Sequence, residues 1–400
     1  MTRAPVAFVI ITVMLDAMGI GLIVPVMPDL IREVQGGSLA NAAIWGGVLS
    51  TVFAVMQFCF SPLVGNLSDR YGRRPILLIS LVVMALDYIV MALAGSIWLL
   101  LAGRIVGGIT AATQSTATAF IADISKPEEK SANFGLVGAG FGLGFVLGPL
   151  IGGVLGEYGT RAPFYAAAGL AALNAVFGFI VMRETVTDGI RRSFDWRRAN
   201  PLGAFQQMRK LPGILPLLVV YFLYSVAFFV YPAIWSYYTQ ERFGWSPQTI
   251  GLSLALFGIM MAIVQGGLIR LILAWLGERR TVVFGHVFDF AVFGLIAAVS
   301  NGTWALILTP LAALGAVITP ALQGIMSKRV GDDAQGELQG VLNSVNALAM
   351  VLSPLMMTGT FAAFTGEAAP VYAPAAPFLL SMALILAGLA VFVRSRSAAA

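Results

Sequence analysis

The chain has 400 residues, of which 58% are apolar and only 11% are charged, and its mean hydropathy is +0.88. Because soluble globular proteins carry about 25% charged residues, this composition excludes a soluble protein and indicates an integral membrane protein. The net charge of +5 alone would suit a nucleic-acid partner, but membrane orientation accounts for it, as shown below. The single cysteine, Cys59, excludes an internal disulfide and a cysteine metal cluster.

A helix needs about 20 apolar residues to cross a bilayer, and the apolar runs predict twelve such helices. They lie near residues 5–27, 44–64, 75–94, 98–121, 134–156, 163–182, 213–235, 249–271, 281–299, 304–326, 339–361 and 375–394. We therefore expect an all-α integral membrane protein with short connections between most helices.

The basic residues predict the orientation. If the N-terminus is cytoplasmic, the Lys and Arg residues fall in cytoplasmic connections or at the termini, apart from Arg32, Arg161 and Arg242 outside and Arg104 within a helix. This asymmetry follows the positive-inside rule and predicts two cytoplasmic termini, as in a multi-pass protein of a bacterial inner membrane. No nucleic-acid partner is required.

Four charged residues lie inside predicted spans: Asp16 in the first, Asp87 in the third, Arg104 in the fourth and Asp289 in the ninth. A charge at the centre of a membrane helix costs about 2.5–3.5 kcal/mol, so each is a candidate functional group. Arg104 could simply neutralise one acid in a structural ion pair. One arginine cannot neutralise three carboxylates, so we expect at least one acid to exchange a proton or meet a cationic ligand.

The loop after the second helix contains Asp69, Arg70 and Arg73, and Asp123 ends the fourth helix. These side chains can form a charge-assisted latch on the cytoplasmic surface, although a solvated basic loop is the simpler alternative.

The fifth helix carries closely spaced small residues and a proline: Gly144, Gly148, Pro149, Gly152 and Gly153. Glycines four residues apart permit close helix contact, and the proline favours a bend. The run lacks the strand and the Lys-Ser/Thr ending of a phosphate loop, and one His and one Cys cannot build a recognisable catalytic site. We therefore expect no enzyme activity.

The two halves resemble each other at an offset of 205 residues. The offset pairs Gly72 with Gly277, Gly135 with Gly340, and residues 147–150 (LGPL) with 352–355 (LSPL). These matches favour a duplicated six-helix unit, with residues 1–182 and 213–400 as bundles and 183–212 as a cytoplasmic linker. Two parallel six-helix bundles with a binding site between them define the major facilitator fold.

The seventh helix is rich in aromatic residues. Tyr224, Phe228 and Tyr231 can line a pocket for a flat ligand or pack in the core, while Trp235, Tyr237 and Tyr238 are most simply an interfacial belt. The only histidine, His286, lies three residues before Asp289 on the same helical face. It can relay protons to Asp289 or be a solvated interfacial side chain.

The whole chain resembles the tetracycline–proton antiporters of the twelve-helix drug-efflux group of the major facilitator superfamily. The matching segments are 15–22 (LDAMGIGL), 69–75 (DRYGRRP), 86–88 (LDY), Arg104, the Gly148-Pro149 antiporter motif, 242–245 (RFGW), 277–280 (GERR), 320–324 (PALQG) and 335–340 (QGELQG).

The resemblance implies export of tetracycline, as a complex with a divalent cation such as Mg²⁺, in exchange for protons. It implies functional charges at Asp16, Asp87, Arg104 and Asp289, and a cytoplasmic gate at Asp69, Arg73 and Asp123. Gln57 and Gln265 match positions associated with drug handling. Met261 stands where family members generally carry a histidine, which puts the drug and the proton path in question; His286 is a possible substitute.

Four hypotheses remain in view. The first is a proton-coupled exporter of tetracycline-like drugs, and the second is a proton-coupled exporter of another amphipathic drug or metabolite. A receptor or channel with the same fold, and a membrane-embedded enzyme, are more remote. The expected partners are a small-molecule drug, protons and membrane lipid, with no cofactor bound by the protein alone.

Overall fold

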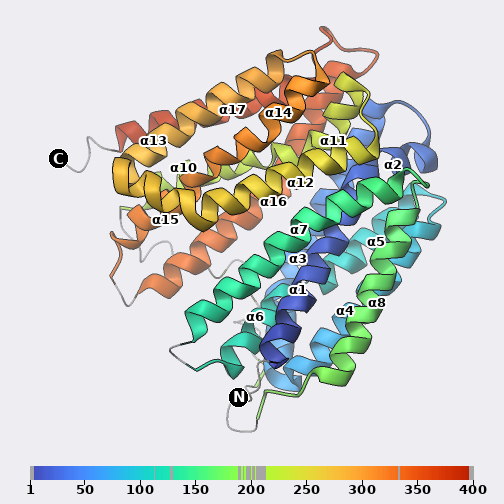
Figure 1. Ribbon diagram of the computed structural model, residues 1–400, viewed down its shortest axis with the longest axis vertical. Helices are drawn as coiled ribbons and strands as arrows, with labels where there is room; N and C mark the ends of the chain where they lie inside the picture. The colour runs from blue at the N-terminus through green and yellow to red at the C-terminus, as the bar shows by residue number, and fades with distance from the viewer. Residues whose placement is uncertain are drawn as a thin grey trace. The chain divides into compact units, whose positions relative to one another are not determined.

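The computed structural model describes residues 4–395 apart from 112, 127–128, 188–190, 192, 195–199, 201–202, 204–212 and 332–333. All regular elements in these residues are helical (Figure 1). The chain divides into two compact units: unit 1 comprises 1–36, 52–201 and 246–255, and unit 2 comprises 37–51, 202–245 and 256–400. The boundaries predicted at 183–212 stay a prediction, because most of that linker lies outside the described residues.

Unit 1 contains the first helices of the chain. They are α1 (Ala4–Ile23), η1 (Val24–Val26), α2 (Met27–Gln35), most of α3 (Leu39–Tyr71), α4 (Arg73–Leu93), α5 (Ile97–Thr110), α6 (Thr113–Ile124), α7 (Lys130–Gly156) and α8 (Ala162–Val181). Helix α1 packs against α7 and α8, and α4 packs against α8 and α5. A cluster around Phe8, Leu77, Phe120 and Val137 forms the apolar core near one end of these helices.

Unit 2 contains the remaining helices. They are α10 (Leu215–Phe228), α11 (Val230–Phe243), the second part of α12 (Pro247–Ile263), the π-helix η3 (Val264–Leu268), α13 (Ile269–Ala298), α14 (Gly302–Ala312), η4 (Ala313–Val317), α15 (Ile318–Ser327), α16 (Gln335–Thr365) and α17 (Ala376–Arg394). Helix α10 packs against α16 and α17, and α13 packs against α15 and α17.

The structure shows the repeat predicted at an offset of 205 residues. Helices α5, α6 and α7 begin at residues 97, 113 and 130, and α14, α15 and α16 begin at 302, 318 and 335. The N-caps of α5 and α14 also correspond, since Ser96 accepts from the Leu99 N–H and Asn301 accepts from the Thr303 N–H. Gly72 and Gly277 both have positive φ, at 112° and 71°, where glycine avoids the strain of other residues. The expected two-repeat fold is confirmed.

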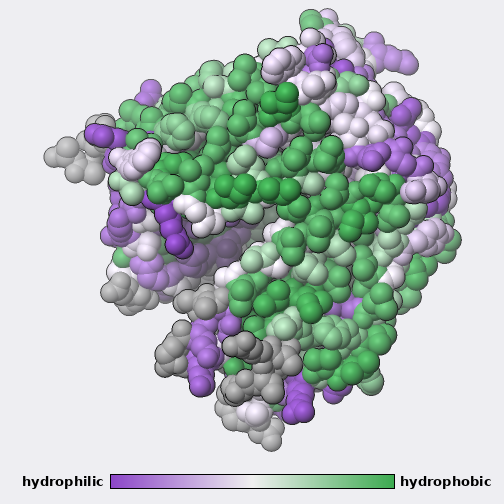
Figure 2. All heavy atoms as spheres, in the orientation of Figure 1, coloured by the Kyte–Doolittle hydropathy of each residue, from purple (hydrophilic) through white to green (hydrophobic). Residues whose placement is uncertain are grey.

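Among the described residues, ten helices are long and apolar enough to span a membrane. The difference from twelve has two sources. The predicted helix 98–121 is described as two shorter helices, α5 and α6, on either side of residue 112, which lies outside the described residues. The predicted helices 249–271 and 281–299 run together from 247 to 298, with a kink at Gly277. Figure 2 shows apolar side chains over the visible flanks of the helices, as expected for surfaces in contact with lipid.

The interfacial belt predicted at the end of the seventh helix is wrong. Trp235, Tyr237 and Tyr238 are 1%, 5% and 0% exposed, and the Tyr238 hydroxyl donates to the Ile296 carbonyl at 2.7 Å. Helix α11 extends to Phe243, further than the predicted 235, so these aromatic residues lie within a longer helix and pack against α13, α16 and α17.

Candidate functional site

In unit 1, α4 and α5 bring Asp87 and Arg104 together in a buried ion pair. Arg104 Nη2 donates to Asp87 Oδ2 at 2.9 Å, and the two side chains are 10% and 2% exposed. The carboxylate fits against Gly103 and Gly107, where a Cβ would lie 2.7 and 2.6 Å from its oxygens. The guanidinium also lies 5.1 Å from the centre of the Phe53 ring, in a cation–π contact. Asp87 is therefore the acid that Arg104 neutralises, as the sequence allowed for one of the three membrane carboxylates.

Tyr88 interacts electrostatically with this pair and with Asp16. The Tyr88 side chain is buried, and its hydroxyl packs against Gly19, where an added Cβ would lie only 3.0 Å from the hydroxyl oxygen. It lies within electrostatic reach of Asp16, Asp87 and Arg104. The sequence indicated Tyr88 only as part of the segment 86–88; the structure adds it to the charged cluster of unit 1.

In unit 2, Asp289 on α13 is 2% exposed. Its carboxylate packs directly on the backbone of Gly315 in η4, where a Cβ would overlap both oxygens. Oδ2 has no hydrogen-bond partner among the described residues. The Tyr224 hydroxyl donates to the Gly315 carbonyl at 3.2 Å, so Tyr224 and Asp289 meet the same short turn.

His286 lies in the same region and is fully buried, so the solvated alternative predicted for it is wrong. Its Nδ1 donates to the Val282 carbonyl at 2.8 Å, one turn back along α13. Its ring centre is 6.2 Å from that of Tyr224, and Nε2 faces Gly388 of α17. Nε2 has no hydrogen-bond partner in the described part of the chain.

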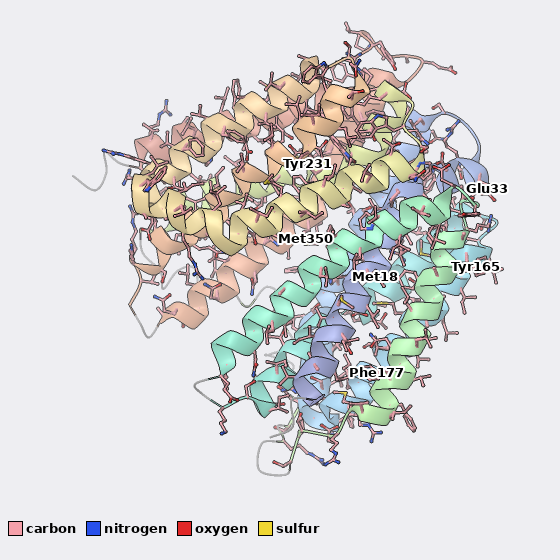
Figure 3. The ribbon with its side chains drawn as sticks, viewed as in Figure 1. Met18, Glu33, Tyr165, Phe177, Tyr231 and Met350 are labelled. Atoms are coloured by element: carbon pink, nitrogen blue, oxygen red, sulfur yellow. The ribbon has the colours of Figure 1, made fainter. Side chains whose placement is uncertain are left out.

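Tyr231 is the centre of an aromatic cluster, labelled in Figure 3. Its ring centre lies 5.1 Å from Phe257, 5.7 Å from Phe293 and 5.8 Å from Phe228. The hydroxyl groups of Tyr224 and Tyr231 both interact electrostatically with the Asp289 carboxylate. Unit 2 therefore places one buried carboxylate beside a continuous set of aromatic rings.

The predicted drug-handling residues have local partners. Gln57 Nε2 donates to the Ala111 carbonyl at 3.3 Å, where α5 ends. Gln265 lies in the π-helix and donates to the Met261 sulfur at 3.2 Å. Because π-helical turns are rare and are found frequently at functional sites, this segment is a candidate for ligand contact.

The predicted latch is formed around Arg73 in unit 1. Arg73 pairs with Asp69 at 2.5 Å and with Asp123 at 3.2 Å, and its Nη1 donates to Ser68 Oγ. Arg70 instead stacks on the neighbouring Tyr71 ring. We use the name Arg73 latch for Asp69, Arg73 and Asp123.

Glu184, which the sequence did not indicate, completes this region. Its carboxylate accepts from the backbone N–H groups of Arg73 and Arg74 at 2.9 and 3.2 Å, and so caps the start of α4. An anion at a helix N-terminus is stabilised by the unpaired N–H groups there. Glu184 lies 110 residues beyond Arg74, and no local pattern connects the two.

The glycines of α7 make the close contacts that their spacing predicts. Gly144, Gly148 and Gly152 lie against the carbonyls of Met14, Met18 and Leu22 in α1, where added side chains would collide with backbone. A second contact joins Gly153 to the first turn of α12, at Pro247 and Gly251. The motif is therefore a packing surface toward two helices.

Comparison with known proteins points to a single family. Residues 9–354 match the family model described as Major Facilitator Superfamily. The class C tetracycline resistance protein of Escherichia coli is 42% identical over 353 residues, 88% of each chain. The class G protein of Vibrio anguillarum is 38% identical over 366 residues, 91% of this chain and 92% of that one.

Solved structures agree. The human organic anion transporter MFSD10 (TETRAN) is similar with a TM-score of 0.70 and 26% identity, covering 98% of this chain and 99% of that one. A bacterial homolog of the human lysosomal transporter Spinster, in an inward-facing and occupied conformation, has a TM-score of 0.78 at 15% identity, covering 99% and 98% of the two chains; this second likeness concerns the fold alone.

Proposed function

Since the chain belongs to the tetracycline-efflux family of the Major Facilitator Superfamily, we propose that it is a proton-coupled antiporter that exports tetracycline-like drugs by alternating access. Membership of the family implies that the chain is a multi-pass membrane protein and a drug exporter, and that it is not an enzyme. What we propose in addition is the coupling to protons, the chemical form of the substrate and the identity of the membrane. The proposed membrane is the bacterial inner membrane, with both termini cytoplasmic.

The observation that carries the proposal is the environment of Asp289. A buried carboxylate without a compensating cation is stable when it is protonated, because the charged form loses its hydration. Oδ2 of Asp289 has no partner among the described residues, and the described ion pairs do not include this residue. A group of this kind can hold a proton in one state and release it when water or a cationic drug reaches it.

The other membrane charges have different proposed roles. Arg104 pairs with Asp87 at 2.9 Å in the described state and so favours the charged form of its carboxylate against the cost of burial. Asp16 and Asp87 then provide negative charge for a cationic substrate in unit 1. Tyr224 and His286 position the segment around Asp289, and His286 Nε2 is available to accept a proton.

The divalent cation is proposed to arrive as part of the substrate. Within the described residues there is no group of three or more His, Cys, Asp or Glu side chains that could hold a metal ion. A complex of tetracycline with Mg²⁺ carries net positive charge and would be attracted by the acidic side chains of the spans. Gln57, Gln265 and Met261 are the proposed contacts for its neutral parts.

Proton release from energised everted vesicles tests the proposal. Adding tetracycline with magnesium should release protons from vesicles with the native protein, and Asp289→Asn should abolish this release without changing the amount of protein inserted. Glu367→Gln, an exposed carboxylate in unit 2, is the matched control and should behave as the native protein does. Normal drug-driven release by Asp289→Asn would remove Asp289 from the coupling role.

A second candidate is proton-coupled export of another amphipathic drug or metabolite. The Met261–Gln265 contact favours it, because a thioether coordinates hard cations poorly and tolerates varied apolar surfaces. A panel of cationic and neutral drugs, tested with and without magnesium in the same vesicles, decides between the two. Magnesium-dependent release with tetracycline alone supports the first candidate, and magnesium-independent release with other drugs supports the second.

A further inference from the structure

A pocket of about 600 Å³ lies at one end of unit 2, away from Asp289 along α13. It is formed where α13 turns at Gly277, and α15 and α17 supply its other walls. In Figure 1 this end lies near the labels of α13 and α15, at the end of α17 that carries Phe392 and Val393. None of the residues proposed to move drug or protons lines it.

The walls of this pocket are amphipathic. Five of its nine lining residues are apolar: Leu276, Val283, Ile325, Phe392 and Val393. The polar part is Glu278, Arg279 and Arg280. The Arg279 guanidinium lies 5.3 Å from the centre of the Phe392 ring, which holds it at the border between the apolar and polar walls.

The charge of the pocket is positive. Lys328 pairs with Glu278 at 2.7 Å, so the one acidic lining residue is already compensated. Among the lining residues, Arg279 and Arg280 against Glu278 give a net charge of +1, and Lys328, which pairs with Glu278 without lining the pocket, raises the charge of the group to +2. An anion with an apolar extension fits such a surface better than a cation or a neutral molecule does.

The surroundings indicate where that anion comes from. Trp275 and Leu271, just before the turn, are 84% and 57% exposed, and Val393 in the pocket wall is 52% exposed. Large apolar side chains exposed at the end of membrane helices face lipid, and tryptophan is typical of the interface with water. Basic pockets between helices on the cytoplasmic side are suited to anionic lipid headgroups.

We propose that this pocket is a binding site for one anionic phospholipid of the leaflet that faces it. Arg279 and Arg280 hold the lipid phosphate, and the start of an acyl chain lies along Val283, Ile325 and Val393. Arg279 and Arg280 lie on the side of the membrane that the sequence predicts to be cytoplasmic, so the lipid would come from the cytoplasmic leaflet. The inference is independent of the drug that is exported and of proton coupling.

The test is native mass spectrometry of the delipidated full-length protein in detergent, titrated with phosphatidylglycerol or phosphatidylcholine. We expect one saturable phosphatidylglycerol site, with binding at least five-fold weaker for phosphatidylcholine and for the double variant Arg279→Gln/Arg280→Gln. The control Arg183→Gln/Arg270→Gln removes the same charge from two exposed positions outside the pocket and should keep native binding.

A second variant tests the pocket without changing its charge. Ile325→Trp fills the apolar wall and should weaken phosphatidylglycerol binding, while elution volume and thermal stability check that each variant is folded. Equal loss in both double variants would overturn the proposal, since general attraction would then explain binding. Equal binding of the two lipids, or binding of glycerol 3-phosphate as tight as that of phosphatidylglycerol, would also overturn it.

Discussion

At the scale of single residues, the buried pair between Asp87 and Arg104 allows two roles, structural and functional. Removing one partner of a buried pair leaves an uncompensated charge and typically costs about 3–5 kcal/mol. We therefore expect Arg104→Gln or Asp87→Asn to lower the melting temperature of the purified protein, and the double variant Asp87→Asn/Arg104→Gln to recover most of the loss. Differential scanning fluorimetry in detergent measures all four proteins.

Transport assays on the same four proteins separate the roles. If the double variant recovers both stability and drug-driven proton release, the pair is structural only. If it recovers stability while release stays low, Asp87 or Arg104 acts on substrate or proton. A double variant less stable than both single variants would contradict the ion-pair explanation, because no buried charge remains in it.

The individual membrane charges were predictable because charge within an apolar run is conspicuous. Their pairing was not, since Asp87 and Arg104 are brought together by the crossing of two helices. Glu184 illustrates the same limit: an exposed acid after an apolar helix has no distinguishing feature in the sequence, and only the fold places it at the start of α4.

At the scale of helices, the contact of Glu184 with the start of α4 predicts a measurable cap. Replacing a side chain that accepts from helix N-terminal N–H groups costs about 0.5–2 kcal/mol. Glu184→Ala should therefore increase amide hydrogen exchange at Arg73 and Arg74, with little change in the middle of α4. Glu129→Ala, which removes a side chain that makes no cap bond to α7, is the comparison. Unchanged exchange at Arg73 and Arg74 would show that water replaces the cap without loss.

The contact between α1 and α7 gives a second prediction at this scale. A Cβ on Gly148 would lie 2.6 Å from the Met18 carbonyl oxygen, whereas a Cβ on Gly142, in the same helix, would meet nothing within 4 Å. Overpacking costs about 1–3 kcal/mol, so Gly148→Ala should lower the melting temperature and Gly142→Ala should not. Equal melting temperatures for the two variants would mean that α1 and α7 separate without penalty.

Helix boundaries were predicted less well than helix positions. Hydropathy alone predicts separate helices over 249–271 and 281–299, whereas these run together from 247 to 298 with a kink at Gly277. The prediction of an interfacial belt at Trp235, Tyr237 and Tyr238 was wrong for a different reason. Aromatic side chains suit both an interface and a packed core, and the choice depends on neighbours that come from other helices.

At the scale of the whole molecule, the repeat carries a difference of charge. The offset of 205 residues that relates the two halves pairs Arg73 with Glu278 and Asp123 with Lys328. Arg73 and Asp123 form an ion pair at 3.2 Å in unit 1, and Glu278 and Lys328 form the corresponding ion pair at 2.7 Å in unit 2, but with the signs exchanged. The position of the link has therefore been kept in both repeats while its polarity has been reversed.

Burial decides which of the two links contributes more. The Arg73 and Asp123 side chains are 13% and 19% exposed, and Arg73 belongs to a network with Asp69 and Ser68. The Lys328 side chain is 72% exposed, and exposed ion pairs typically contribute about 0–1 kcal/mol.

Double-mutant cycles on thermal stability should give a larger coupling for Arg73→Gln/Asp123→Asn than for Glu278→Gln/Lys328→Gln. High salt should remove the second coupling almost completely and the first only in part, because water and ions reach Lys328 freely. A larger coupling at Glu278–Lys328 would mean that unit 2 depends on its link as strongly as unit 1 does.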